Sequence, residues 1–165
     1  MARPSIPTAR RVSYAHGYIE LGLVAAAAEE LDNVVPDDRQ TVPVLLARIE
    51  LHLADGNWAA LVTAARLAAR ADPAQERAWI GWAFGQRRLT ALPDARAVLI
   101  EGETHHGATS ALLHYNLACY DCQLGDLPGA RARLQRAFQL AREFRVLALA
   151  DPDLLSLRAE IAAMP

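Results

Sequence analysis

The chain contains no lysine: its 17 basic residues are all arginine, set against 19 acidic residues, for a formal net charge of −2. A charge this close to zero provides no overall field that would attract nucleic acid, a membrane surface or a strongly charged substrate. No apolar run approaches the roughly 20 residues needed to span a bilayer. We therefore expect a soluble protein that binds neither nucleic acid nor membranes.

Cysteine is also scarce, with only Cys119 and Cys122 in the sequence. One such pair is no disulfide framework, which favours a reducing compartment and hence a cytoplasmic protein. The Cys-x-x-Cys spacing, with His114 just before it and His105 and His106 further upstream, is nevertheless typical of metal and thiol redox sites. A metal or thiol redox site is therefore an alternative interpretation of this pair.

The common catalytic motifs are missing as well. No glycine-rich phosphate loop follows a strand, and neither Gly-x-Ser-x-Gly nor His-Glu-x-x-His occurs. Paired acids such as Glu29-Glu30 and Asp37-Asp38 fall at expected helix ends or connections, where solvated carboxylates are ordinary. We therefore predict no catalytic residues, no cofactor and no enzymatic activity.

What the chain does contain is an internal repeat. Shifting the sequence by 34 residues, and by 35 in the last step, aligns several positions at once. One aligned column holds Gly22, Gly56, Thr90 and Gly125. A second column holds small or apolar residues, which are Ala27, Leu61, Ala95 and Ala130.

Apolar residues recur at spacings of three and four, as in Tyr14, Tyr18 and Leu21, whereas strand-like alternation is nowhere sustained. An all-α fold of about four helix pairs is therefore predicted. The expected parts are an extended N-terminal segment (1–7) and one domain (8–165) with repeats at 8–40, 41–74, 75–109 and 110–145 and a capping helix at 152–163. Asp72-Pro73 and Asp151-Pro152 are each predicted to begin a helix, as a capping carboxylate followed by a first-turn proline.

The two ends of this stack differ. Leu154, Leu157 and Ile161 would cover the fourth helix pair, because one helix alone cannot hide its apolar face. No comparable polar helix precedes the first repeat. The N-terminal edge is therefore a candidate surface for self-association, with a monomer as the open alternative.

The repeat resembles the tetratricopeptide repeat (TPR) family, whose pattern includes Leu-Gly and an alanine on successive helices. The closest match is "YNLACYDCQLGD", with Leu117, Ala118 and Leu124-Gly125, followed by Ala130. The ending "LADPDLLSLR" is similar to the closing segment of many small bacterial members. The resemblance covers about residues 8 to 163, and it implies a right-handed α-solenoid.

The resemblance also implies a concave groove, lined by the first helix of each repeat, that binds a peptide or helix of a partner protein. Carried over to this sequence, the groove positions are His16, Glu20, Glu50, Arg77, Phe84, Arg87, Arg88, Tyr115, Asn116, Cys119, Cys122 and Gln123. The implied function is that of a non-catalytic adaptor, scaffold or small chaperone.

An acidic partner segment is expected near Arg77, Arg87, Arg88 and Asn116, because arginine binds carboxylates well. The alternative is that these arginines form a solvated rim. The arginines between residues 131 and 145 are interpreted as a solvated convex face, since no aromatic platform is interleaved with them.

In this register Cys119 and Cys122 are groove positions that need no metal. His114 would lie about 140° around the helix from Cys119, so ligands from elsewhere would have to complete a metal site. A predicted neighbour of Cys122 is Arg87, whose charge would favour a thiolate. A metal or thiol site on the repeat scaffold therefore remains the alternative function.

Overall fold

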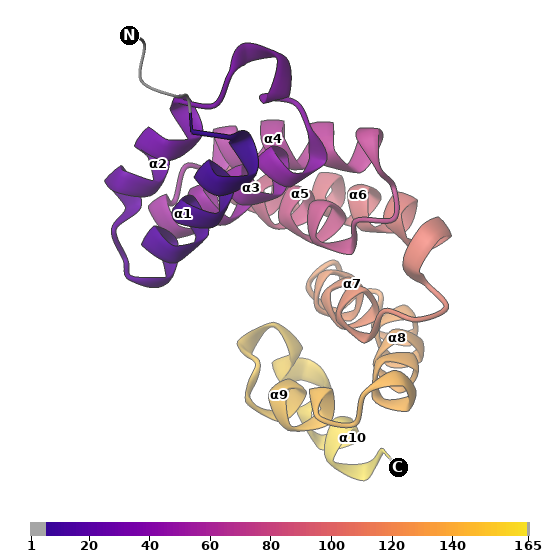
Figure 1. Cartoon of the computed structure of the whole chain (residues 1–165). Coiled ribbons are helices and arrows are strands. Elements are labelled where there is room, and N and C mark those ends of the chain that lie inside the picture. The colour runs from indigo at the N-terminus through magenta and orange to yellow at the C-terminus, as the bar shows by residue number, and fades with distance from the viewer. Residues whose placement is uncertain (1–5, 165) are drawn as a thin grey trace, which may run out of the picture. The chain divides into compact units, whose positions relative to one another are not determined.

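The computed structural model describes residues 6–164, which Figure 1 shows in colour. In that range ten α-helices and two 3₁₀ helices follow one another, and no residue belongs to a strand. The predicted all-α class is therefore confirmed. The chain divides into two compact units, the first ending at Leu89 and the second beginning at Thr90. This boundary falls inside the predicted third repeat.

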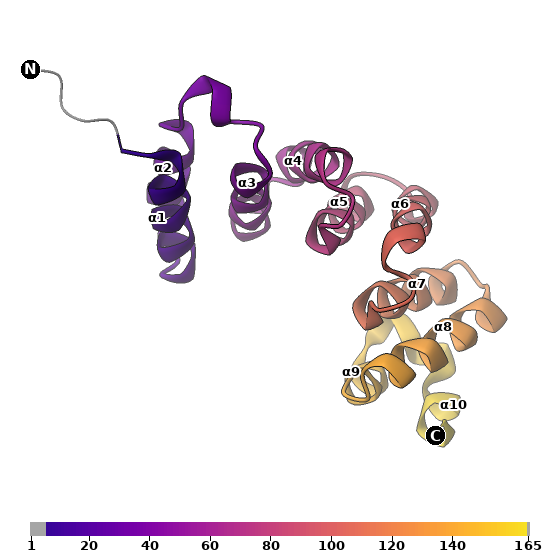
Figure 2. The same cartoon turned by 45° about the vertical axis from the view of Figure 1, so that its right-hand side comes forward.

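The first unit is built from consecutive helices that pack against their neighbours in the chain. Its elements are α1 (Thr8–Glu20), α2 (Val24–Asp32), the 3₁₀ helix η1 (Pro36–Asp38), α3 (Val42–Asp55), α4 (Trp58–Ala71) and α5 (Glu76–Leu89). Helix α3 contacts α1, α2, α4 and α5, and Figure 2 shows it between α1 and α5. The first helices of the first three predicted repeats, α1, α3 and α5, thus follow one another as neighbours.

Small residues let these helices approach closely. Ala27 of α2 and Ala65 of α4 are fully buried. In α5 a side chain at Gly85 would place its Cβ 2.8 Å from Cγ2 of Val62 on α4. The close packing of α4 and α5 therefore depends on a glycine at that position.

The glycine column ends the first helix of three predicted pairs. Gly22, Gly56 and Gly125 have φ angles of 73°, 70° and 86°. These values lie in the left-handed region, where a Cβ is unfavourable and glycine is preferred. Glycine recurs at this spacing because the same left-handed turn follows each of these three helices.

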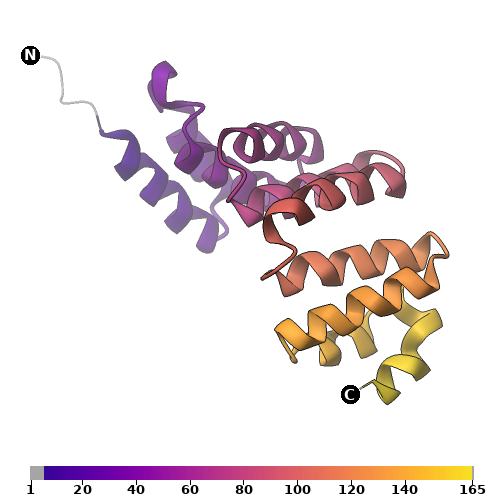
Figure 3. The same ribbon diagram turned by 90° about the vertical axis from the view of Figure 1, so that its right-hand side faces the viewer.

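The second unit is organised around a buried helix. Its elements are α6 (Leu92–His106), α7 (Ala111–Gln123), α8 (Leu127–Leu140), α9 (Phe144–Ala150), the 3₁₀ helix η2 (Pro152–Leu157) and α10 (Arg158–Ala163). Helix α7 contacts α6, α8, α9 and η2, and Figure 3 shows α7 and α8 side by side. Its apolar residues lie on nearly all sides, as expected of a helix surrounded by protein.

The C-terminal segment differs from the single capping helix predicted for residues 152–163. It forms η2 and then α10, and a separate helix α9 precedes it. In a 3₁₀ helix, residues three apart eclipse one another, so Leu154 and Leu157 both face inward. These two side chains and that of Ile161 are fully buried, which confirms that the segment covers the end of the unit.

The two Asp-Pro predictions have different outcomes. The Asp151 carboxylate accepts a hydrogen bond from the Asp153 N–H at 2.9 Å, and Pro152 begins η2 as predicted. Asp72 accepts from the Ala74 N–H at 3.1 Å, but α5 begins only at Glu76. The prediction that Pro73 begins a helix is therefore wrong, because the Asp72 carboxylate stabilises a turn there instead.

Candidate functional site

Three of the predicted groove positions meet in the first unit. The Glu50 carboxylate on α3 has a partner at each oxygen. Nδ1 of His16 on α1 lies 2.5 Å from Oε2, and a guanidinium nitrogen of Arg77 on α5 lies 2.5 Å from Oε1. Each residue comes from the first helix of a different predicted repeat. The contacts between α1 and α3 and between α3 and α5 bring these helices together and thereby position the cluster.

The cluster offers one cation to a ligand. Glu50 is largely buried and uses both carboxylate oxygens, whereas the Arg77 side chain is 63% exposed. A guanidinium has five N–H donors, so Arg77 can bind Glu50 and still donate to a carboxylate outside the unit. Glu20, exposed at the end of α1, adds a carboxylate to this face. Arg77 is therefore the group of the cluster that can bind a carboxylate.

Phe84 and Arg88 belong to an aromatic cluster within the first unit. The Arg88 guanidinium lies over the rings of Trp58 and Phe84, at 5.3 Å and 5.2 Å from their centroids. The two rings meet edge to face at 5.7 Å. Phe84, Arg87 and Arg88 also line a small cavity of about 260 Å³. Arg88 is thus held by cation–π contacts and is less available than Arg77 for binding a carboxylate.

In the second unit, the predicted groove positions of α7 are covered by the chain's own C-terminal segment. Tyr115, Cys119 and Cys122 are buried. The Tyr115 hydroxyl donates to Asp151 Oδ2 at 2.6 Å, and the Cys119 thiol lies 3.6 Å from the same oxygen. Cys122 Sγ lies 3.1 Å from the Ser156 hydroxyl. These three side chains therefore face η2 and are not an open groove wall.

The remaining groove positions on α7 are more accessible. Gln123 is exposed and donates to the Asp153 carboxylate, while Asn116 is half-buried. Asn116 and Arg77 belong to different units, so their predicted joint role stays a prediction. The same holds for the predicted proximity of Arg87 to Cys122.

The C-terminal segment also brings two carboxylates close to one of the thiols. Cys119 Sγ and one oxygen each of Asp151 and Asp153 lie within 4.8 Å of one another. Thiolate and carboxylate are both ligands of zinc. His114 makes other contacts, because its Nε2 lies 2.8 Å from the Gly107 carbonyl oxygen. Carboxylate ligands that α7 itself lacks are thus present beside Cys119, from Asp151 just before η2 and from Asp153 within it.

Ser156 and Asp153 were not identified as groove contacts from the sequence, although a signal was present. Ser156 follows Cys122 by 34 residues, the same separation that joins His16 to Glu50. Continuing the repeat by one more step would have placed the C-terminal segment beside α7. The segment therefore occupies the place of the next first helix.

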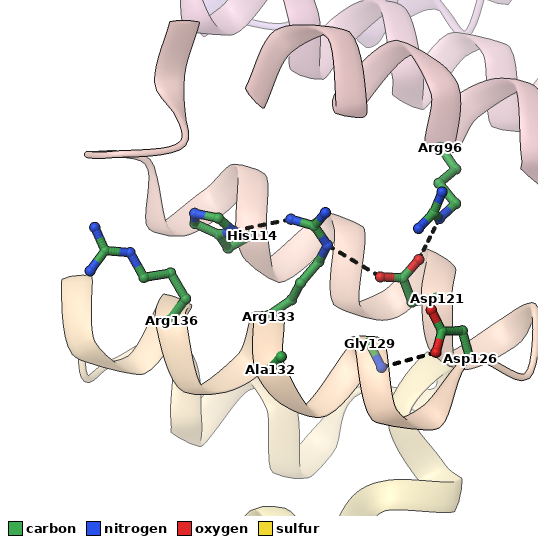
Figure 4. A pocket seen from close by; sticks show the side chains of 8 residues that line it. All are labelled: Arg96, His114, Asp121, Asp126, Gly129, Ala132, Arg133 and Arg136. Carbon is green, nitrogen blue, oxygen red and sulfur yellow. Dashed lines mark hydrogen bonds and ion pairs between the residues drawn. The ribbon is translucent and has the colours of Figure 1, made fainter. Parts of the chain in front are cut away.

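A second polar site, missed from the sequence, lies in the second unit and is shown in Figure 4. It is a cavity of about 370 Å³ lined by Arg96, His114, Asp121, Asp126, Gly129, Ala132, Arg133 and Arg136. Asp121 is only 1% exposed and pairs with Arg96 of α6. Arg133 Nε of α8 lies 3.2 Å from Asp121 Oδ2, close enough for an ion pair but outside hydrogen-bond geometry. The only sequence signal was an acid inside the apolar stretch "LACYDC".

Glu103 completes this network on α6. Its two oxygens accept from Arg133 at 2.5 Å and 3.0 Å. The hydrogen bond from Arg133 lowers the pKa of Glu103 despite the opposing effect of partial burial. Arg133 therefore joins α8 to both α6 and α7, and the arginines predicted to form a solvated face are in part used internally.

The chain matches no protein-family model and no curated protein. In the part of the chain that the structure describes, no helix combines the length and apolarity that a membrane crossing requires.

Proposed function

We propose that the protein is a tetratricopeptide-like helical-repeat protein that binds other proteins without catalysing a reaction. In this proposal its helix pairs form a right-handed solenoid, and it acts as an adaptor, scaffold or small chaperone. Support comes from the glycine turns repeated at Gly22, Gly56 and Gly125. Further support comes from consecutive packing of the helices within each unit. A reducing, cytoplasmic location fits two cysteines that are both free thiols.

The observation that carries the proposal is the meeting of His16, Glu50 and Arg77. Three residues assigned to one binding face by their repeat positions come from three helices and share one carboxylate. We propose that a peptide or helix of the partner lies across this face and that a carboxylate of the partner binds Arg77. Such charge-assisted hydrogen bonds are the stronger kind, and arginine is enriched among residues that dominate binding energy.

Affinity capture with matched variants tests this proposal. Arg77→Glu reverses the charge of the binding face, whereas Arg158→Glu makes the same change at an exposed position of α10. We expect quantitative mass spectrometry to find proteins that wild type and Arg158→Glu retain equally. Retention of these proteins by Arg77→Glu should fall by about tenfold or more, which corresponds to about 1.4 kcal/mol.

Glu50→Gln should have the opposite effect on the retention of captured proteins. It removes the internal carboxylate that competes for Arg77, so we expect the same proteins to be retained more strongly. Circular dichroism melting of each variant shows whether the helices remain folded. Equal capture by wild type and a folded Arg77→Glu protein would contradict the proposed face.

A metal site is the second candidate function, favoured by the approach of Asp151 and Asp153 to Cys119. A divalent ion such as zinc would have to replace the present hydrogen bonds of Asp151 with Tyr115 and Cys119. Metal analysis of the purified protein, with Cys119→Ser as the comparison, tests it. One equivalent of zinc, lost in the variant, would support this candidate. Wild type that binds no added zinc in isothermal titration would eliminate it.

A further inference from the structure

The C-terminal end of the second unit contains a cavity of about 710 Å³, which we call the C-terminal cavity. Helix α9 contacts both α8 and α10 there, and Figure 2 shows the three helices together. The described residues that line the cavity are Gln135, Phe138 and Gln139 of α8, Arg142 between α8 and α9, Arg145 of α9, and Met164 after α10. Cavities of about 300 to 1,000 Å³ are typical of small-molecule sites.

Two apolar side chains form the inner part of this lining. Phe138 is 6% exposed and Met164 is 8% exposed. Gln135 and Gln139 lie on the same face of α8 as Phe138, but both are exposed to solvent. A methionine side chain is flexible and adapts to the shape of its neighbours. The cavity can therefore hold an apolar group against Phe138 and Met164.

Two arginines supply the charge of the C-terminal cavity. Within residues 6–164 the Arg142 guanidinium has no hydrogen bond or ion pair, and that of Arg145 donates only to the Ala162 carbonyl, at 2.8 Å. No acidic residue is among the described residues of the lining. Glu143 lies between the two arginines in the chain, so residues 142–145 carry a net charge of +1. The two guanidinium groups can therefore donate to a singly charged anion.

The cavity in Figure 4 is different in this respect. Arg96 and Arg133 both pair with Asp121 there, and Arg133 also binds Glu103. These guanidinium groups are largely used within the unit and have few donors left for a ligand. In the C-terminal cavity, by contrast, no carboxylate of the described chain is paired with Arg142 or Arg145.

We propose that the C-terminal cavity binds a small carboxylic acid with an apolar body, in its anionic form. The carboxylate accepts hydrogen bonds from Arg142 and Arg145, and the apolar body packs against Phe138 and Met164. Burial of the apolar body supplies a favourable free energy, while the charge-assisted hydrogen bonds orient the ligand. A carboxylate carries one negative charge, which matches the net charge of residues 142–145 better than a phosphate dianion does.

This inference does not depend on the proposed binding of a partner protein. None of the described lining residues is a predicted groove position, and Arg77 belongs to the other unit. The lining favours a small molecule over a peptide, because it comes from one end of one unit. A peptide groove of the predicted kind would instead run along successive first helices.

Isothermal titration calorimetry with decanoate as the probe tests the inference. We expect wild type to bind one equivalent with a dissociation constant on the order of 10 to 100 μM, as is usual for a ligand of this size. Butanoate keeps the carboxylate but lacks most of the apolar body, and decan-1-ol keeps the apolar body but lacks the charge. Each should bind at least about tenfold more weakly than decanoate.

Matched charge reversals locate the site. Arg142→Glu places an acid at the cavity, whereas Arg158→Glu makes the same change at an exposed position of α10 that does not line it. The Arg142 guanidinium has no partner in the described chain, so its replacement should leave the melting temperature unchanged. We expect decanoate to bind Arg142→Glu at least about tenfold more weakly than wild type, and to bind Arg158→Glu as tightly as wild type.

Several results would overturn the inference. One is wild type that does not bind decanoate at millimolar concentrations. Others are a folded Arg142→Glu protein that binds decanoate as tightly as wild type, or an equal loss of binding in Arg158→Glu. Butanoate or decan-1-ol that binds as tightly as decanoate would also overturn it, because the apolar lining or the arginines would then contribute nothing. None of these results bears on the face at Arg77, which the capture experiment tests separately.

Discussion

The hydroxyl of Tyr115 on α7 donates a hydrogen bond to Asp151 at 2.6 Å and so joins the central helix of the second unit to the segment that begins η2. Asp151 also accepts from the Asp153 N–H, and therefore orders the first turn of η2. Through these bonds the C-terminal segment is held over a face of α7 that the sequence had assigned to a partner.

Replacement of Tyr115 by phenylalanine should weaken this attachment. The variant keeps the ring against Phe144, which it contacts at a centroid distance of 5.1 Å, but leaves Asp151 without its hydroxyl donor. We expect the free energy of unfolding to fall by about 1.5 to 3 kcal/mol, the usual range for a hydrogen bond to a charged group. Urea denaturation followed by circular dichroism measures the change, and unchanged stability would contradict the role given to this bond.

The same variant should alter alkaline stability. Burial, and then the hydrogen bond to Asp151, raise the pKa of Tyr115 above its ordinary value near 10. Above pH about 10 the unfolded chain loses the phenolic proton while the folded chain keeps it, so stability falls as pH rises. Tyr115→Phe should show a shallower loss of stability above that pH than wild type in denaturation curves at successive pH values. If stability fell equally steeply with pH in both proteins, the raised pKa of Tyr115 would be contradicted.

Ser156→Cys should form a disulfide with Cys122. Their present side-chain atoms lie 3.1 Å apart, so a second thiol at position 156 would be close to the first. By the chain-entropy model, a loop of this length contributes about 3 to 4 kcal/mol. Mass spectrometry after mild oxidation should find the bond, and denaturation with and without reductant should show the stabilisation. Ser13→Cys, at an exposed position of α1, is the control that should keep Cys122 free.

Acid should weaken the network around Arg133. The hydrogen bond that Arg133 donates to Glu103 lowers the pKa of Glu103 in the folded state. The stabilisation of the folded state by this bond is therefore complete above the ordinary glutamate pKa, near 4.5. It is lost as pH falls below that value and the carboxylate is protonated in the folded chain. Glu103→Gln should therefore flatten the pH dependence between pH about 5 and 3. Glu20→Gln, at an exposed site, serves as the matched variant.

Gly56→Ala should destabilise the first unit. Added atoms would have room, since the nearest atom to a Cβ there is in the Trp58 ring at 3.6 Å. The penalty is conformational, because an L-residue at this φ of 70° costs about 1 to 2 kcal/mol. Thermal melting checks this, and Gly17→Ala makes the same substitution where φ is ordinary and stability should rise. A neutral Gly56→Ala would contradict the turn's requirement for glycine.

Helix positions were largely predictable because they depend on local chemistry. The glycine column located three turns, and the apolar spacing of three and four located the helices on either side. Predictions of helix boundaries failed where a short segment can adopt more than one local conformation. Pro73 could have begun a helix, yet the Asp72 carboxylate stabilises a turn, and the C-terminal cap is split between η2 and α10.

For the candidate site, one period of 34 residues separates His16 from Glu50, and the two are neighbours on successive first helices. Continued by one more step, the same period relates Cys122 to Ser156 and so indicates that the C-terminal segment lies beside α7. The sequence around Tyr115 and Cys122 itself does not distinguish a surface for a partner from one covered by the same chain. That outcome depends on how η2 packs, which is a long-range property.

By itself the sequence determined the helical class, the repeated turns and the residues that share a face, because periodicity and glycine act over a few neighbouring residues. Only the tertiary structure decided how those faces are used. It placed Asp121 between two arginines and Glu50 between His16 and Arg77, and it covered the thiols of α7 with the C-terminal segment. The reason is that buried charges and thiols need hydrogen-bond or ion-pair partners. Tertiary packing determines those partners, because it brings together residues that are far apart in the chain.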